Sequence, residues 1–396
     1  MDTNRTFVEV DYYLCSKDRQ SVAGDVFLSH RIPDQQRTIC VLADGLGSGI
    51  KANVLATLTA TMTMRYILDD IDICRASEII MSTLPVCKER KIGYSTFTIL
   101  DIKHDGMVDV IEYDNPPYVL MRGQQTLDIQ KNQITVKTDN IGMRDIWHSR
   151  FESKENDRVV FFSDGVTQSG MGTATMPLGW TDEQAVHHIA ATCARMPDIS
   201  ARNLSREVVA AARRNDAYHS KDDTTCAVVY FRSPRKTLII TGPPIDKQRD
   251  VELANIVREF PGKKIVCGGT TANIIARELD VTISTDLYGH HNYDVPPTSK
   301  MEHVDLVTEG ILTLTRSVEI LKKELHPEKL PKDAAVQLVR ILLDSDIIQF
   351  VVGTKINDAH QDPNLPVELD IRRNLIKKFV ALLNDKYLKE ASFKLI

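Results

Sequence analysis

Hydrophobic and polar residues follow two different patterns along this chain, and the pattern changes near residue 235. In the first part, apolar-rich runs of strand character predominate, and residues 33–36 separate two of them with turn-forming residues. Residues 50–68 contain no glycine or proline and place most apolar side chains on one face, which predicts a helix. The other predictions here are strands at 26–32, 37–43, 157–163 and 224–231, a meander at 94–102, 107–113 and 117–122, and a mostly helical stretch at 181–214.

The second part of the chain alternates short apolar strands with helical segments. Such alternation favours an α/β domain with a partly parallel sheet. We therefore expect an α+β domain at residues 1–235, followed by a smaller α/β domain at residues 236–396. The strands predicted in the second domain are 237–241, 264–267, 303–308 and 347–353, and the helices are 246–260, 271–279, 309–325 and 367–388.

Composition narrows the class of protein. The chain is 42% hydrophobic and 26% charged, which is typical of globular domains, and its net charge of -5 gives no reason to expect nucleic-acid binding. Seven cysteines lie far apart without a C-x-x-C pair, which indicates a reducing cytosol. Residues 1–10 lack the apolar core of a signal peptide, and no apolar run approaches the ~20 residues of a membrane span. We expect a cytoplasmic protein without a membrane segment.

Four aspartates lie at the ends of predicted strands or directly opposite such ends, where a carboxylate can face a cleft while its neighbours enter the sheet. They are Asp25, Asp44, Asp164 and Asp222. For any one of them a role as a turn or cap residue is the simpler interpretation, because Asp-Gly pairs are common in turns. All four together, without basic neighbours, favour a site for hard divalent cations, which prefer carboxylate oxygens.

The hairpin around residues 33–36 adds a geometric argument. If its turn centres between Asp34 and Gln35, then Asp25 lies directly opposite Asp44, with Cβ atoms ~5 Å apart. Two like charges at that separation are destabilising unless a cation lies between them. A small change in the turn centre would instead place the two side chains on opposite faces of the sheet.

Three glycines, Gly45, Gly47 and Gly49, follow Asp44 and precede the helix predicted at 50–68. Main-chain N–H groups in such a run could bind phosphate at the helix N-terminus. The spacing matches neither a dinucleotide fingerprint nor a P-loop. Because an aspartate comes directly before the run, we favour a metal-binding turn in which glycine lets a carbonyl oxygen approach the ion.

Five short motifs occur in a characteristic order: Ala23-Gly24-Asp25, residues 43–49, residues 114–118, residues 162–167 and residues 222–225. In this order and spacing they resemble the PPM-type metal-dependent serine/threonine protein phosphatases. They look most like the bacterial branch named after stage II sporulation protein E. The resemblance spans residues 8–231.

The resemblance implies an α-β-β-α sandwich of two antiparallel sheets, with two Mn²⁺ or Mg²⁺ ions bound in a cleft at one end. It implies that Asp44 bridges both ions, that Asp25 and the Gly45 carbonyl bind one ion, and that Asp164 and Asp222 bind the other. On the same basis Asp44, Asp164 and Asp222 would be the catalytic residues. Asp223 would support these ligands, or would replace Asp222 if the motif register is shifted by one residue.

The chain also departs from the family pattern. Leu46 stands where many eukaryotic members have a histidine, so the proton donor for the leaving group is unassigned. An upstream arginine that binds phosphate in some members is not evident in the sequence.

The resemblance implies hydrolysis of phosphoserine or phosphothreonine on a protein, with an anti-sigma-factor antagonist in a partner-switching pathway as a possible substrate. One alternative is a scaffold that kept the fold and acts by binding partners. Another is that the main chemistry belongs to the C-terminal domain and the phosphatase regulates it.

The second domain carries a candidate ligand loop where a predicted strand meets a predicted helix. Gly268, Gly269, Thr270 and Thr271 would offer N–H groups and hydroxyls to a small anionic ligand at the helix start. An equally good interpretation is purely structural: the glycines form a tight turn and a threonine caps the helix. Residues 241–244 and 308–310 would lie on the same edge of a parallel sheet. His290, His291, His303, Asp358, His360 and Asp362 match no known metal-site spacing and are expected in surface loops.

Overall fold

The computed structural model describes residues 6–32, 34–83, 95–138, 142–285, 298–325, 327, 330–355, 368–387 and 389–396. Within the chain, contacts separate a first unit, Met1–Ser233, from a second unit, Pro234–Ile396. None of the helices in these described ranges is long and apolar enough to cross a bilayer.

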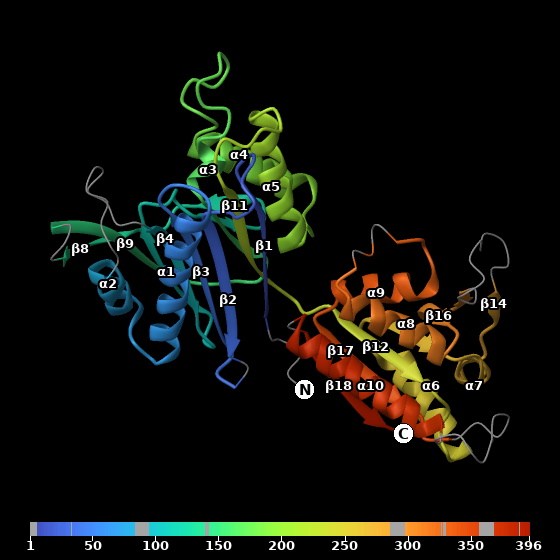
Figure 1. The fold of residues 1–396 in the computed structure, drawn as a ribbon. Helices are drawn as coiled ribbons and strands as arrows, with labels where there is room; N and C mark the ends of the chain where they lie inside the picture. The colour runs from blue at the N-terminus through green and yellow to red at the C-terminus, as the bar shows by residue number, and fades with distance from the viewer. Residues whose placement is uncertain are drawn as a thin grey trace. The chain divides into compact units, whose positions relative to one another are not determined.

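The first unit contains two antiparallel sheets, and helices cover the outer face of each (Figure 1). One sheet has the strand order β2 (Asp25–Ile32), β3 (Arg37–Gly45), β4 (Ser95–Ile102), β5 (Met107–Tyr113), β9 (Gly142–Glu152) and β8 (Asn132–Thr138). The other has the order β1 (Phe7–Cys15), β11 (Thr224–Arg232), β10 (Asp157–Phe162), β6 (Val119–Arg122) and β7 (Gln125–Leu127). The helices are α1 (Ile50–Leu68), α2 (Ile73–Thr83), α3 (Asp164–Thr167), α4 (Asp182–Arg195) and α5 (Ala201–Asn215).

Three hydrophobic clusters hold these layers together. Leu42 and Leu100 from the first sheet meet Phe161 and Val229 from the second in a core between the sheets. A second cluster packs α1 and α2 against β3, β4 and β5, and a third packs α4 and α5 against β10 and β11. The predicted α-β-β-α sandwich is confirmed.

One predicted connection in this unit is wrong. Residues 117–122 were expected to continue a meander with 107–113, but β6 pairs with β10 in the opposite sheet. Pro116 and Pro117 lie between β5 and β6, and proline has no N–H with which to continue a ladder. The chain therefore leaves β5 at this point and crosses to the other sheet.

The second unit is a doubly wound α/β fold with a mixed sheet, which confirms the predicted fold class. Five parallel strands have the order β16 (Val304–Thr308), β13 (Lys263–Cys267), β12 (Lys236–Thr241), β17 (Ile347–Val352) and β18 (Glu390–Leu395). Two short strands, β14 (Ile283–Thr285) and β15 (Ser299–Met301), extend the β16 edge in antiparallel fashion.

Helices cover both faces of this sheet (Figure 1). A short turn of 3-10 helix at Lys247–Arg249 leads into α6 (Asp250–Glu259), which packs on one face together with α7 (Gly269–Leu279). The opposite face carries α8 (Ile311–Lys322), α9 (Ala334–Asp344) and α10 (Glu368–Asp385). Among these elements α9, β14, β15 and β18 were not predicted.

Candidate active site

The β2–β3 hairpin places two of the predicted aspartates side by side. The strands pair in the register Asp25 with Asp44, and Ile32 with Arg37 at the turn end. The predicted juxtaposition of Asp25 and Asp44 is confirmed. Both carboxylates therefore lie at the same end of the first sheet.

Asp25 also links the two sheets. Its side chain is 2% exposed, and Oδ2 accepts hydrogen bonds from the hydroxyls of Ser163 at 2.7 Å and Thr225 at 2.6 Å. Burial, with the charges of Asp223 and Asp164, raises the pKa of Asp25 to about 7, although the two hydroxyl hydrogen bonds act in the opposite direction. The other carboxylate oxygen, Oδ1, is buried and has no hydrogen-bond partner in the described structure. It is an acceptor without a donor.

The carboxyl groups of Asp44 and Asp164 lie close enough to act on each other's pKa. Burial raises the pKa of Asp44 well above its usual value, and the charges of Asp25, Asp164 and Asp222 raise it further. Burial and the charge of Asp222 also raise the pKa of Asp164, whose Oδ2 accepts a hydrogen bond from Gln168 at 2.7 Å. Two carboxyl groups in such contact need either a shared proton or a cation.

Glycines allow the backbone segments of the site to approach closely. A Cβ on Gly165 would lie 2.0 Å from the carbonyl oxygen of Asp223, so only glycine lets α3 begin against this segment. Similarly, a Cβ on Gly45 would lie 2.0 Å from the carbonyl oxygen of Ala52 in α1. The Asp-Gly pairs thus place Asp44 at the end of β3 and Asp164 at the start of α3, where the backbone is tightly packed.

The two neighbouring aspartates before β11 have different surroundings. Asp223 is buried, and its two carboxylate oxygens accept hydrogen bonds from the main-chain N–H groups of Lys17 at 2.8 Å and Gly24 at 2.6 Å. Asp222 is half-buried, and its charge acts on both Asp44 and Asp164. These surroundings favour Asp222 over Asp223 as a metal ligand. Asp223 instead holds the loop before β2 through its hydrogen bonds.

Lys17 is a residue of this site that sequence reasoning missed. Its ammonium lies 3.8 Å from Asp222 Oδ1, and its side chain remains 37% exposed. Because Lys17 and Asp222 are far apart in the chain, no local motif points to the pair. The hydroxyls of Ser163 and Thr225 on Asp25 were missed for the same reason.

The carboxylate oxygens of this site are ligands of the kind that divalent cations prefer. The charges of Asp25, Asp164 and Asp222 raise the pKa of neighbouring carboxyl groups here, and Asp25 Oδ1 has no hydrogen-bond donor in the described part of the chain. Across the described ranges, however, no three acidic, histidine or cysteine side chains already form a compact ligand set. The centre is the close pair Asp44 and Asp164, and the charges of Asp25 and Asp222 act on it.

The candidate ligand loop belongs to the second unit. Gly268 precedes α7 with φ at 123°, and its N–H donates to the Thr308 carbonyl at 2.9 Å. Gly269 and Thr270 are exposed, whereas Thr271 is buried. His303 is exposed, and His290, His291, Asp358, His360 and Asp362 lie outside the described residues.

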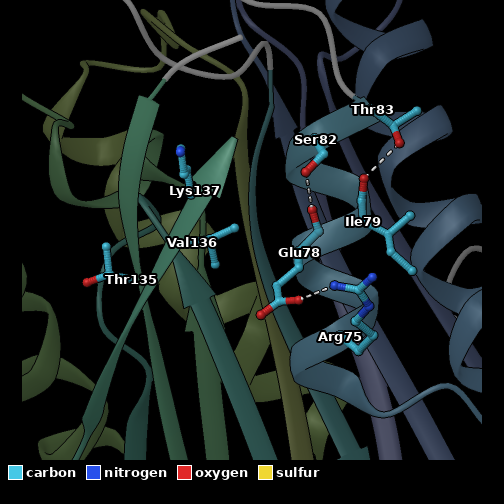
Figure 2. A pocket seen from close by; sticks show the side chains of 8 residues that line it. All are labelled: Arg75, Glu78, Ile79, Ser82, Thr83, Thr135, Val136 and Lys137. Atoms are coloured by element: carbon cyan, nitrogen blue, oxygen red, sulfur yellow. Dashed lines mark hydrogen bonds and ion pairs between the residues drawn. The ribbon is translucent and has the colours of Figure 1, made fainter. Parts of the chain in front are cut away.

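A hollow of about 350 Å³ lies elsewhere in the first unit, between α2 and the edge strand β8 (Figure 2). None of the site aspartates lines it. Arg75 forms an ion pair with Glu78 there, and the hydroxyls of Ser82 and Thr83 bond to carbonyls of their own helix (Figure 2). These groups satisfy one another within α2, so we assign the hollow no catalytic role.

Comparison with known proteins identifies the family. The model of the family described as Stage II sporulation protein E matches residues 34–232. The chain belongs to this family. A search of curated proteins found no match.

Solved structures similar to this chain include members of bacterial regulatory systems. The phosphatase domain of SpoIIE from Bacillus subtilis, solved with a fragment of its regulatory domain, is 18% identical with a TM-score of 0.47. That match covers 57% of this chain and 64% of the SpoIIE chain, which is less than two thirds of its length. The RsbU and RsbW domains of Rv1364c from Mycobacterium tuberculosis are 15% identical with a TM-score of 0.47, covering 64% of this chain and 68% of that chain.

Proposed function

We propose that the first unit is a metal-dependent phosphatase that hydrolyses phosphoserine or phosphothreonine on a protein. The observation that carries the proposal is the convergence of Asp25, Asp44, Asp164 and Asp222 from four separate segments at one end of the sandwich. Family membership supports the same activity.

Two divalent cations, Mn²⁺ or Mg²⁺, are the proposed cofactors. Asp25 and the Gly45 carbonyl would bind one ion, Asp164 and Asp222 the other, and Asp44 both. When bound, such ions activate a water molecule as nucleophile and neutralise charge on the phosphoryl oxygens.

The remaining groups of the site orient these ligands. Ser163 and Thr225 hold one oxygen of Asp25, and the other has no donor among the residues that the structure describes. Gln168 fixes one oxygen of Asp164. The ammonium of Lys17 faces Asp222 and supplies the positive charge that a phosphoryl group would meet at this side of the site.

The proposed partner of this site is a phosphoprotein, with an anti-sigma-factor antagonist of a partner-switching pathway as the candidate substrate. Support for this substrate class comes from membership of the sporulation protein E family. A small anionic ligand on the second unit remains a separate proposal.

The experiment that tests the activity is hydrolysis of p-nitrophenyl phosphate by the purified full chain with Mn²⁺, Mg²⁺ or EDTA. We expect metal-dependent turnover that falls by at least about a hundredfold in Asp44→Asn and Asp164→Asn, because each change removes a charged ligand of the reacting centre. Asp34→Asn is the matched control, since Asp34 is exposed in the turn at the other end of the same hairpin.

Turnover that persists in EDTA, or in both site variants, would contradict the proposal. Absence of turnover together with absence of bound metal would favour the scaffold. A protein that binds Mn²⁺ but leaves p-nitrophenyl phosphate intact would be tested next on a phosphoprotein.

A further inference from the structure

The second unit has the strand arrangement of an open, doubly wound sheet with a topological switch point. From the central strand β12 the chain moves outward to β13 and β16, then returns to the other side of β12 as β17 and continues to β18 (Figure 1). The helices after β12 and β13 cover one face, and α10, after β17, covers the other. In such sheets, ligands bind beyond the carboxyl ends of the two strands where the connections diverge. Here those strands are β12 and β17.

The loops that leave these two strands are packed against each other at glycines. Gly242 follows β12 with φ at +82°, and Gly353 follows β17. A Cβ on Gly353 would lie 2.1 Å from the Gly242 carbonyl oxygen, so no larger residue fits there. The Lys355 N–H donates to the Pro243 carbonyl at 3.1 Å, which joins the two loops further out.

A buried cation lies at the same point. Arg372, in α10, is only 8% exposed, and its Nη1 would be 2.5 Å from a Cβ on Gly242. Burying a guanidinium is costly unless anionic or carbonyl groups compensate its charge. Arg372 has an interaction partner within the protein, so an incoming anion would join or replace that contact.

We propose that the second unit binds a small anion, a carboxylate or a phosphate monoester, at the switch point between β12 and β17, with Arg372 as its counter-ion. A dinucleotide does not suit the site. Pro243 and Pro244 have no N–H groups, so the first loop cannot cradle a pyrophosphate as a glycine-rich dinucleotide loop does. The inference does not depend on the proposed phosphatase activity.

Isothermal titration of the metal-free full chain tests the proposal, with inorganic phosphate and malonate as the two probes in a buffer free of both. Removing metal excludes phosphate bound at a metal centre of the first unit. We expect saturable binding of at least one probe, and a dissociation constant ten- to a hundredfold higher in Arg372→Gln, since a charge-assisted hydrogen bond is lost. The response to the two probes distinguishes phosphate from carboxylate.

Two matched variants make the result specific. Arg373→Gln removes the exposed arginine next in sequence on α10 and should bind the probe as the wild type does. Thr270→Ala alters the exposed first turn of α7, after β13, and should also bind normally, because the site lies between β12 and β17. Should Arg372→Gln fail to fold, Arg372→Lys replaces it and should still weaken binding, because lysine lacks the planar fork of the guanidinium.

Three results would overturn the proposal. The wild type could bind neither phosphate nor malonate. The folded Arg372 variant could bind the probe as tightly as the wild type. Lastly, Thr270→Ala could abolish binding while the Arg372 variant keeps it, which would move the site to the start of α7.

Discussion

Asp109 shows how a single buried charge is kept ionised in the first unit. Its side chain is 0% exposed, and it accepts hydrogen bonds from Arg150, Lys103 and His148. Burial alone would raise the pKa of Asp109, but these hydrogen bonds outweigh it and lower the pKa to about 2. The carboxylate therefore stabilises the fold only while it is charged.

This arrangement predicts a loss of stability in acid. Because the folded pKa of about 2 lies below the ordinary value of 3.8, Asp109 contributes its full stabilisation above pH ~4 and loses it as the pH falls towards 2. A shift of this size corresponds to about 2 kcal/mol in the free energy of unfolding. Denaturant unfolding between pH 2 and 6 should show this slope in the wild type and a weaker slope in Asp109→Asn. The exposed Asp128→Asn should keep the wild-type slope, and an unchanged slope in Asp109→Asn would refute the assignment.

Lys17 offers a second test at the scale of one residue. Its backbone N–H is held by Asp223, so truncating the side chain leaves the loop anchored. If the ammonium meets the phosphoryl group, Lys17→Ala should raise KM for p-nitrophenyl phosphate about three- to tenfold with kcat nearly unchanged. Lys51→Ala, an exposed lysine on α1, is the control. An unchanged KM with a lower Mn²⁺ requirement would instead show that the ammonium only neutralises Asp222.

Site residues differ in how far sequence alone could place them. Asp25, Asp44 and Asp164 were predicted as site residues because each lies at the end of an apolar strand, where a polar side chain interrupts the apolar pattern. Asp222 and Asp223 could not be separated by pattern, since the distinction rests on the N–H groups of Lys17 and Gly24, which face Asp223 across the fold. No sequence motif marked Lys17 as a residue near these aspartates.

At the scale of an element, α3 depends on the absence of a side chain at Gly165. An added Cβ would meet the Asp223 carbonyl oxygen at 2.0 Å, so α3 would have to move away from β11. We expect Gly165→Ala to lower the free energy of unfolding by about 1–3 kcal/mol and to remove phosphatase activity at temperatures where the variant is folded. Chemical denaturation and turnover of p-nitrophenyl phosphate measure the two effects.

Gly269→Ala is the matched control for this change. Gly269 is also near the start of a helix, but nothing lies within 4 Å of an added Cβ. The free energy of unfolding of the Gly269→Ala variant should be unchanged or slightly higher, because alanine restricts the unfolded chain. Equal losses in both variants would mean that the effect is a general helix-start effect and that the close contact with Asp223 is not its cause.

Elements differ in how far the pattern of apolar residues predicted them. The helix at residues 50–68 agrees with α1 at both ends. By contrast, α9 was not predicted, although its buried residues Ala335, Leu338, Val339 and Leu342 lie on one face. In β9 the inward positions include Ser149, and the polar residues around it hide the alternation of a strand. β18 is a short edge strand with a single buried residue, Ala391.

On the scale of the whole molecule, each unit has hydrophobic cores of its own. The three clusters of the sandwich draw on residues before Ser233, and the two clusters of the doubly wound unit draw on residues after Pro234. Units of this size bury enough surface to fold independently. The predicted domain boundary after residue 235 lies close to this division and stays a prediction until the fragments are made.

We therefore expect fragments 1–233 and 234–396 to fold separately, and calorimetry of the full chain to show two transitions that match those of the fragments. Because every proposed ligand of the metal centre lies in the first fragment, it should retain Mn²⁺-dependent turnover of p-nitrophenyl phosphate. A turnover clearly above that of the full chain would make the second unit an inhibitor of the phosphatase, and the anion proposed at Arg372 the natural candidate to relieve it. An unfolded first fragment would contradict the independence of the two units, and an inactive but folded one would mean that the second unit completes the site.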